Sequence, residues 1–230
     1  MNIAILLSGG TGSRLCAEVP KQYIKAVDRM IVSHCLDKLC CHPMIDAVQV
    51  VAAELWREDI LQECTHQEKL RGFSEPGENR QLSILNGLRD VVLFASGEDV
   101  VLVHDAARPL VSDEMITACL TEIRGHDGVM PVLPMTDTVY YSSNGKQVEK
   151  LMDRVCIFAG QAPESFRLGK YLEANERLFP DKILKINGST EPAIMAGMDI
   201  AMIPGEKENF KITTKDDLER YTALLEKGKK

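Results

Sequence analysis

The chain has 230 residues, 45% of them hydrophobic and 27% charged, which suffices for a core and excludes a disordered protein. Its net charge of −7 and its aromatic content of 5% argue against binding of duplex or single-stranded nucleic acid. No apolar run approaches the ~20 residues of a membrane helix, and Met1 to Leu7 is too short for a signal peptide, so we expect one cytoplasmic domain over residues 1–230 that does not bind membranes.

The predicted elements alternate between apolar strands and amphipathic helices. In chain order, we expect strands at 3–7, 48–52, 100–103, 129–133 and 199–203, and helices at 30–40, 55–64, 79–94, 112–123, 168–178 and from 214 onward. The first strand is apolar throughout, which is typical of a parallel strand covered on both faces. The alternation therefore predicts an α/β fold with a doubly wound, mostly parallel sheet of the Rossmann-like kind.

One segment departs from this alternation. Residues 138–141 and 147–151 have strand character and flank Ser142-Ser-Asn-Gly145, in which the Asn-Gly pair favours a hairpin turn. No neighbouring helix covers this hairpin, so we interpret residues 138–153 as an arm that projects from the body. A local hairpin at the edge of the main sheet fits the pattern equally well.

The strongest local signal is Leu7-Ser-Gly-Gly-Thr-Gly-Ser-Arg-Leu15, which directly follows the first strand. Its three glycines let backbone N–H groups approach an anion at the carboxyl end of a strand, where α/β sheets bind ligands. No G-K-[ST] follows, which excludes the Walker form, and Leu15 takes the third glycine position of the dinucleotide form. A tight turn without a ligand remains the alternative for such a loop.

Cations near this loop favour a phosphate ligand. Arg14 lies within the loop, and Lys21 follows Pro20, whose fixed φ angle orients the lysine. Lys211 lies in a short extended stretch just before the last helix, and alone it would be an edge-strand lysine. In an acidic chain, such a group of cations indicates a site for a phosphorylated ligand.

Two further segments carry polar groups at strand or helix ends. In His104-Asp-Ala-Ala-Arg-Pro109, Asp105 would face the glycine loop and suits Mg²⁺, although it could also cap a turn. We interpret His104 as a packing or hydrogen-bonding residue, because no nucleophilic serine or cysteine accompanies it. Residues 75–83 form a turn that opens a helix, where N–H groups could hold a base or ribose or only cap the helix. The seven cysteines include no C-x-x-C pair, which argues against zinc.

Taken together, these motifs resemble those of the methylerythritol-phosphate cytidylyltransferase family and its relatives, the ribitol- and glycerol-phosphate cytidylyltransferases. The matching segments are G-G-T-G-S-R at 9–14, P-K-Q-Y at 20–23, G-E-N-R-Q-L-S at 77–83, H-D-A-A-R-P at 104–109, D-T at 137–138, D-R at 153–154 and F-K-I-T at 210–213. They span nearly the whole chain in the family's order.

The resemblance implies a role for each matched residue. It implies catalytic charge neutralisation by Arg14, Lys21 and Lys211, with Asp105 as the ligand of a Mg²⁺ cofactor. It implies nucleotide contacts from Ser8, Gly9, Gly10, Thr11, Gly12, Gly77, Glu78, Asn79, Ser83, Asp105 and Ala106. It implies that Arg108, Thr138 and Arg154 receive the polyol phosphate, and that the hairpin arm builds a homodimer in which Thr138 and Arg154 reach the neighbour's site.

Two departures point to the substrate. Where the family's methylerythritol enzymes have Thr-Pro and T-D-E-A, this chain has Ala162-Pro163 and Ser189-Thr-Glu-Pro192, which look more like the polyol-phosphate relatives. We therefore expect transfer of CMP from CTP to ribitol or glycerol phosphate, with pyrophosphate released and methylerythritol phosphate as the alternative acceptor. Two other classes stay open: a nicotinamide-dependent oxidoreductase, which lacks its acidic ribose anchor here, and a non-catalytic nucleotide-binding module.

Overall fold

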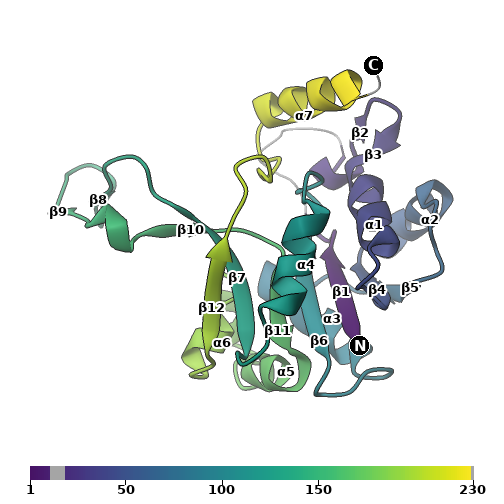
Figure 1. Cartoon of the computed structure of the whole chain (residues 1–230), viewed down its shortest axis with the longest axis horizontal. Helices are drawn as coiled ribbons and strands as arrows, with labels where there is room; N and C mark the ends of the chain where they lie inside the picture. Colours follow the sequence, from purple (N-terminus) through teal and green to yellow (C-terminus); the bar gives the residue numbers. More distant parts are fainter. Residues whose placement is uncertain (11–18, 229–230) are drawn as a thin grey trace.

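The structure is a computed structural model that describes residues 1–10 and 19–228, and its described part contains one large sheet between helices (Figure 1). The eight strands of this sheet are β1 (Asn2–Leu7), β4 (Ala47–Val51), β5 (Leu70–Ser74), β6 (Val100–Asp105), β7 (Gly128–Pro134), β10 (Phe158–Gly160), β11 (Glu164–Arg167) and β12 (Ile200–Pro204). Their order is β10-β7-β11-β6-β1-β4-β5, and β12 pairs with β7.

Most strand pairs are parallel, which confirms the predicted sheet type. β1 lies between β4 and β6 and is parallel to both, β5 is parallel to β4, and β12 is parallel to β7. The exceptions are β10 and β11, which run antiparallel to their neighbours. These two strands and β5 were not among the predicted elements, because each is short and carries few of the continuous apolar residues that mark a buried strand.

Helices cover both faces of the sheet, as a doubly wound fold requires. The helices are α1 (Ile31–Cys41), α2 (Glu54–Glu63), α3 (Arg80–Val91), α4 (Asp113–Thr121), α5 (Leu168–Glu176), α6 (Glu191–Met195) and α7 (Lys215–Gly228). Leu36 of α1 and Ile116 of α4 share one core cluster, whereas Ile84 of α3 and Tyr171 of α5 share the cluster on the opposite face. None of the helices within the described ranges is long and apolar enough to cross a membrane.

The helix ends follow local capping chemistry. Ser112 accepts a hydrogen bond from the backbone N–H of Met115 at 2.9 Å, and Asp217 receives the N–H groups of Thr213 and Thr214 at the start of α7. Asn79 caps α3 by accepting from the N–H of Leu82 at 2.8 Å, so this helix begins one residue later than expected. It also ends at Val91 rather than at residue 94, where the chain turns into solvent.

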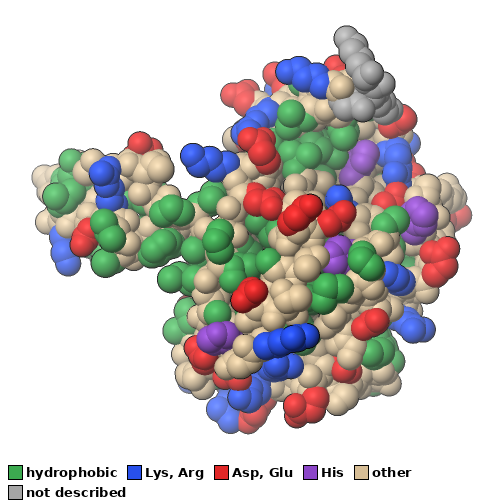
Figure 2. Space-filling model, in the orientation of Figure 1, with side chains coloured by type: hydrophobic (Ala, Val, Ile, Leu, Met, Phe, Trp, Pro, Cys, Tyr) green, Lys and Arg blue, Asp and Glu red, His purple; other side chains and the backbone are tan. Residues whose placement is uncertain are grey.

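The predicted hairpin is an arm and not an edge of the main sheet. β8 (Tyr140–Tyr141) and β9 (Lys150–Leu151) pair antiparallel in a small sheet of their own, which Figure 1 shows projecting from the body. A second small hairpin, β2 (Lys25–Ala26) with β3 (Arg29–Met30), lies near α7. The arm exposes apolar side chains, and Figure 2 shows them spread along it.

Candidate functional site

A cavity of about 400 Å³ opens at the carboxyl ends of β1 and β6, where parallel sheets of this kind bind ligands. Segments that are far apart in the sequence meet here: the start of the glycine loop, the lysine after Pro20, the turn before α3, the end of β6 and the stretch before α7. The lining residues are Leu7, Gly9, Gly10, Lys21, Gln22, Gly77, Glu78, Asn79, Arg80, Ser83, Asp105, Ala107, Lys211 and Thr213.

Two glycines allow the loops around the cavity to approach each other closely. A Cβ atom on Gly9 would lie 2.4 Å from Cβ of Pro76, and one on Gly77 would lie 2.5 Å from Cβ of Leu82. Both distances are far below van der Waals contact, so a side chain at either position would force the backbone apart. The glycine loop therefore uses Gly9 for packing against the turn before α3 as well as for exposing its N–H groups.

The segment that contains Lys21 also holds the first residues of the glycine loop in place. The Gln22 amide donates hydrogen bonds to the carbonyls of Ser8 and Gly10, both at 2.7 Å, and the Tyr23 hydroxyl donates to the Ser8 carbonyl at 2.8 Å. Pro20, whose φ angle is −57°, precedes a short 3₁₀ helix over Lys21–Tyr23. The P-K-Q-Y motif thus supplies a lysine to the cavity and supports the loop opposite it.

Lys21 and Lys211 meet beside Asp105, as the sequence predicts. Nζ of Lys211 donates to Oδ2 of Asp105 at 2.7 Å, and Nζ of Lys21 donates to the carbonyl of the next residue, Ile212, at 2.8 Å. The ion pair shows that Lys211 is not merely an edge lysine. Arg14, the third cation of the prediction, lies outside the described residues, as do Thr11 and Gly12.

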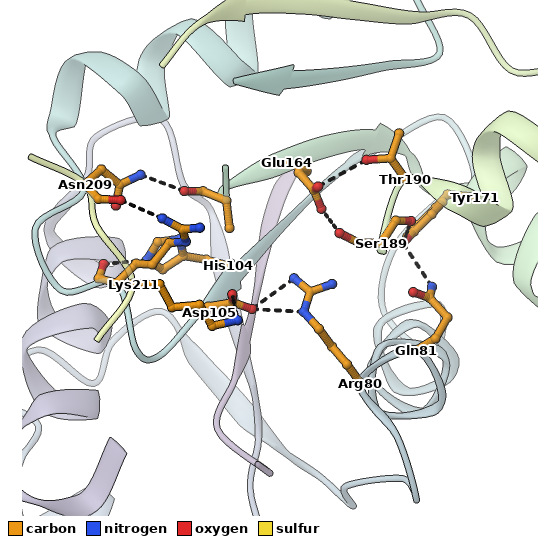
Figure 3. Close-up of polar contacts among 12 residues, drawn as sticks. Arg80, Gln81, His104, Asp105, Glu164, Tyr171, Ser189, Thr190, Asn209 and Lys211 are labelled. Carbon is orange, nitrogen blue, oxygen red and sulfur yellow. Dashed lines mark hydrogen bonds and ion pairs between the residues drawn. The ribbon is translucent and has the colours of Figure 1, made fainter. Parts of the chain in front are cut away.

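Arg80 is a further cation of the cavity that the sequence analysis did not assign. Its Nε and Nη2 atoms donate to Oδ1 of Asp105 at 3.1 and 2.9 Å (Figure 3). Burial opposes ionisation of Asp105, but Arg80 and Lys211 outweigh it and hold the pKa of this carboxyl well below its usual range. Arg80 opens α3, where the helix dipole disfavours a cation, and this unfavourable position was the signal in the sequence.

The turn before α3 is held in shape by the side chains of Asn79 and Ser83. Oγ of Ser83 accepts from the N–H of Gly77 and donates to the carbonyl of Asn79, both at 2.9 Å. Nδ2 of Asn79 donates to the carbonyl of Ile183 at 2.9 Å. Glu78 is exposed at the rim of the cavity. The four predicted residues of this turn therefore lie together, two as supports and two on the wall.

Three predicted residues near the cavity do not line it. Ser8 and Ala106 are 1% exposed and lie just beneath it, while Ala107 takes the place on the wall expected for Ala106. Arg108 is half-buried and donates from Nη1 to the carbonyl of Asn209 at 2.6 Å. These three residues therefore lie next to the cavity without lining it, and their expected contacts with a nucleotide or an acceptor stay predictions.

His104 has a structural role, as expected. Its side chain is fully buried on the face of the sheet opposite Asp105, and its Nε2 lies 3.0 Å from the carbonyl of Arg108. Burial lowers the pKa of His104 to about 4, so the ring is neutral near pH 7. A neutral, buried imidazole with a backbone partner supports the local turn and does not reach the cavity.

Thr138 and Arg154 lie in the arm and not at the cavity. With Leu151, Met152 and Asp153 they line a separate hollow of about 420 Å³ that shares no residue with the first cavity. Nη1 of Arg154 donates to the carbonyl of Thr136 at 2.9 Å. One copy of the chain therefore brings most of the described nucleotide-binding candidates together but leaves these two predicted acceptor residues apart from them.

The carboxylates that line the cavity are Asp105, buried at the end of β6, and Glu78, exposed at the rim, and of these Asp105 is the predicted metal ligand. Within residues 1–10 and 19–228, no cluster of three or more His, Cys, Asp and Glu side chains could hold a metal ion by itself. Mg²⁺ commonly takes one or two protein carboxylates and completes its shell with phosphate oxygens and water. The residues present therefore fit a magnesium ion that arrives with a triphosphate, and not a preformed metal centre.

Comparison with known proteins identifies relatives over the full length of the chain. Residues 2–227 match the family model described as 2-C-methyl-D-erythritol 4-phosphate cytidylyltransferase. The chain is 32% identical to the 2-C-methyl-D-erythritol 4-phosphate cytidylyltransferase of Clostridium acetobutylicum, with 99% of each chain covered. It is 29% identical to the ribitol-5-phosphate cytidylyltransferase of Streptococcus agalactiae, covering 98% of this chain and 96% of the relative.

The fold also matches solved structures. The crystal structure of the 2-C-methyl-D-erythritol 4-phosphate cytidylyltransferase of Francisella tularensis superposes with a TM-score of 0.81 at 27% identity, with 96% of this chain and 98% of that chain covered. The similarity extends over the sheet, the helices and the full sequence, and it includes relatives named for two different acceptors.

Proposed function

Because the chain belongs to the 2-C-methyl-D-erythritol 4-phosphate cytidylyltransferase family and is a nucleotidyltransferase, we propose that it joins CMP from CTP to a polyol phosphate and releases pyrophosphate. The observation that carries the proposal is the convergence of Lys21, Arg80 and Lys211 around one ionised carboxylate, Asp105, in a cavity walled by the glycine loop. Three cations against two carboxylates, Asp105 and the exposed Glu78 at the rim, leave this cavity with the net positive charge that a triphosphate requires.

The reaction needs charge neutralisation more than it needs a base. A phosphate monoester has a second pKa near ~6, so the acceptor is an anionic nucleophile at neutral pH. Its oxygen forms a bond to the α-phosphorus of CTP while the bond from that phosphorus to the pyrophosphate oxygen breaks. Lys21 and Lys211 bind the phosphates and offset the charge that gathers when two polyanions meet. The buried, neutral His104 takes no part.

We include Mg²⁺ in the proposal, with Asp105 as its protein ligand. When bound with the triphosphate, the ion would neutralise part of the charge on the departing pyrophosphate. Both oxygens of Asp105 are engaged here, Oδ1 by Arg80 and Oδ2 by Lys211. These two side chains keep the carboxylate ionised and oriented toward the cavity. When Asp105 binds Mg²⁺ in their place, Arg80 and Lys211 become available to bind phosphate.

We propose a homodimer in which the arm of one copy completes the site of the other. The arm is exposed at Tyr140 (57%), Leu151 (61%) and Val155 (76%), which is a large apolar surface for so small a sheet. Thr138 and Arg154 lie on this arm and reach no phosphate site in their own chain. A second copy is the occupant that explains both facts, because it covers the apolar surface and brings Arg154 to an acceptor phosphate.

For the acceptor we propose an alditol phosphate, with ribitol 5-phosphate first and 2-C-methyl-D-erythritol 4-phosphate second. The sequences at 160–164 and 187–192 favour the first, and the relatives at 29% and 32% identity carry both names. The test measures pyrophosphate release with CTP, Mg²⁺ and ribitol 5-phosphate, glycerol 3-phosphate or methylerythritol phosphate, with Lys21→Ala as control. Release with none of them, or equal release by Lys21→Ala, would overturn the proposal; NADH binding in place of CTP would favour an oxidoreductase.

A further inference from the structure

A second buried carboxylate, Glu164, lies on the far side of Arg80 from Asp105. β11 pairs antiparallel with β6 so that Glu164 lies opposite Val103, and paired residues point to the same face of a sheet. Asp105 is two residues beyond Val103 and shares that face. The register thus places two carboxylates diagonally across two strands, on the face that α3 covers.

Arg80 extends from the first turn of α3 into the space between these carboxylates. Figure 3 shows its guanidinium beside Asp105, to which it is hydrogen-bonded, with Glu164 above it. Two of its nitrogens donate to Asp105, and Glu164 interacts with it electrostatically. Two carboxylates on one buried face would repel each other without a cation between them, and Arg80 is that cation.

Hydroxyl groups hold Glu164 in this position. Oγ of Ser189 donates to Oε2 of Glu164, and Oγ1 of Thr190 donates to Oε1 at 3.1 Å. Glu164 and Thr190 are each 7% exposed, and Ser189 is 3% exposed, so the cluster is closed to solvent. It lines no part of the cavity, and Arg80 is the group that connects it to the wall.

We propose that Glu164 is a positioning residue that, through Arg80, holds Asp105 in place for the reaction. The proposal rests on the cytidylyl transfer proposed above. Attraction from Glu164 holds the guanidinium in the buried position from which it donates both hydrogen bonds to Asp105, and keeps it out of the space that the nucleotide phosphates need. Ser189 and Thr190 fix the carboxylate that exerts this attraction. Ser189 and Thr190 at the start of S-T-E-P (189–192) and Glu164 at the end of Q-A-P-E (161–164) thus act together on Arg80.

The test is a double-mutant cycle with a spectroscopic readout. Glu164→Gln keeps the shape and, above the pKa of Glu164 at about 7, removes the charge. At about pH 8 we expect kcat to fall by about 10-fold, in the range for residues that support a catalytic group, with KM for CTP changed less. In an Arg80→Gln background, the same substitution should cost less than about twofold, because its route to Asp105 is gone. Glu63→Gln changes a partly buried carboxylate that holds the start of α1 and should leave kcat unchanged.

The NMR signal of the Arg80 Nε–H group gives a result that does not depend on turnover. We expect this signal, assigned by its loss in Arg80→Gln, to move in Glu164→Gln and to stay in place in Glu63→Gln. If Glu164→Gln does not fold, Ser189→Ala with Thr190→Val keeps the charge but frees the carboxylate, and the signal should again move. An unmoved signal, or multiplicative losses in the cycle, would overturn the proposal, whereas wild-type protein inactive on every acceptor would overturn only the proposed reaction.

Discussion

The cavity and the arm are built in opposite ways. The cavity is lined by short segments of the chain between Leu7 and Thr213 at one edge of the main sheet, and its charged groups have partners on at least three of these segments. The sheet of the arm consists of two strands of two residues each, β8 and β9, and its apolar side chains face solvent. The described residues of the cavity all come from one chain, whereas the role proposed for the arm requires a second copy. Under the proposed homodimer, nucleotide binding belongs to the monomer and acceptor binding to the dimer.

The largest expected effect comes from removing a cavity cation. Lys211→Ala should lower kcat/KM by ~10²–10³, since in the proposed reaction the lysine binds phosphate and it is paired with Asp105. Steady-state pyrophosphate release measures this loss. Lys146→Ala, an exposed lysine at the tip of the arm, is the matched control and should stay within about twofold of the parent protein. Normal turnover of Lys211→Ala would show that this cavity is not the site of the reaction.

A buried carboxyl in the body and an exposed one in the arm should respond differently to pH. Burial raises the pKa of Glu164 to about 7, despite the attraction of Arg80. Its unfolded pKa is lower, near ~4.3, so the folded protein binds the extra proton and stability falls as pH rises from about 4 through 7. The charged or titratable groups that face it are Arg80, Asp105, Arg108, Cys119 and Tyr171.

Glu164→Gln should abolish this pH dependence. The shift corresponds to about 3 kcal/mol of unfolding free energy, so the variant should gain roughly that amount relative to the parent at about pH 8 and nothing at about pH 4. Glu149→Gln removes an exposed carboxyl of the arm, whose pKa is lowered by its hydrogen bonds with Ser143, and it should produce no comparable gain. Urea unfolding at the two pH values provides the comparison. Equal gains in both variants would contradict the distinction drawn between body and arm.

The next effect tests whether the arm serves another copy. Arg154→Ala should lower kcat/KM for the acceptor by ~10–100-fold, the worth of a charge-assisted contact, while the affinity for CTP stays unchanged. Mixed with Lys211→Ala and refolded or re-equilibrated together, the two inactive proteins should regain about a quarter of wild-type activity, because half of random dimers carry one intact site. Recovery of no activity would assign Arg154 to its own chain.

The difference between the regions also explains what sequence alone could predict. The cavity was predictable because the carboxyl ends of parallel strands meet at one edge, which places the loop after β1 beside Asp105 at the end of β6. Lys21 and Lys211 both line this cavity although 190 positions separate them, and each was identified because it lies in a recognisable motif. Arg80 was not predicted as a site residue, because an arginine in the first turn of a helix does not by itself indicate which carboxylate it will contact.

The network behind Arg80 was beyond prediction for a different reason. It depends on β11, whose four residues carry too little apolar pattern to identify as a strand. Without the antiparallel register of β11 against β6, nothing relates Glu164 to Asp105. The arm was identified as a hairpin from its Asn-Gly turn, but the choice between a projecting arm and an edge of the sheet required the structure.

The smallest effect separates two glycines. Gly145 ends the turn of the arm with φ at +67°, in open space, so Gly145→Ala costs ~1–2 kcal/mol of local strain and no clash. Because the arm is a separate sheet, this strain should speed hydrogen exchange in β8 and β9 and leave CTP affinity and the melting temperature of the body unchanged. Gly9→Ala should do the reverse, because its Cβ meets Pro76 at the cavity wall. If Gly145→Ala weakened CTP binding as Gly9→Ala does, the arm and the cavity would be energetically coupled within one chain, and the assignment of nucleotide binding to the monomer alone would fail.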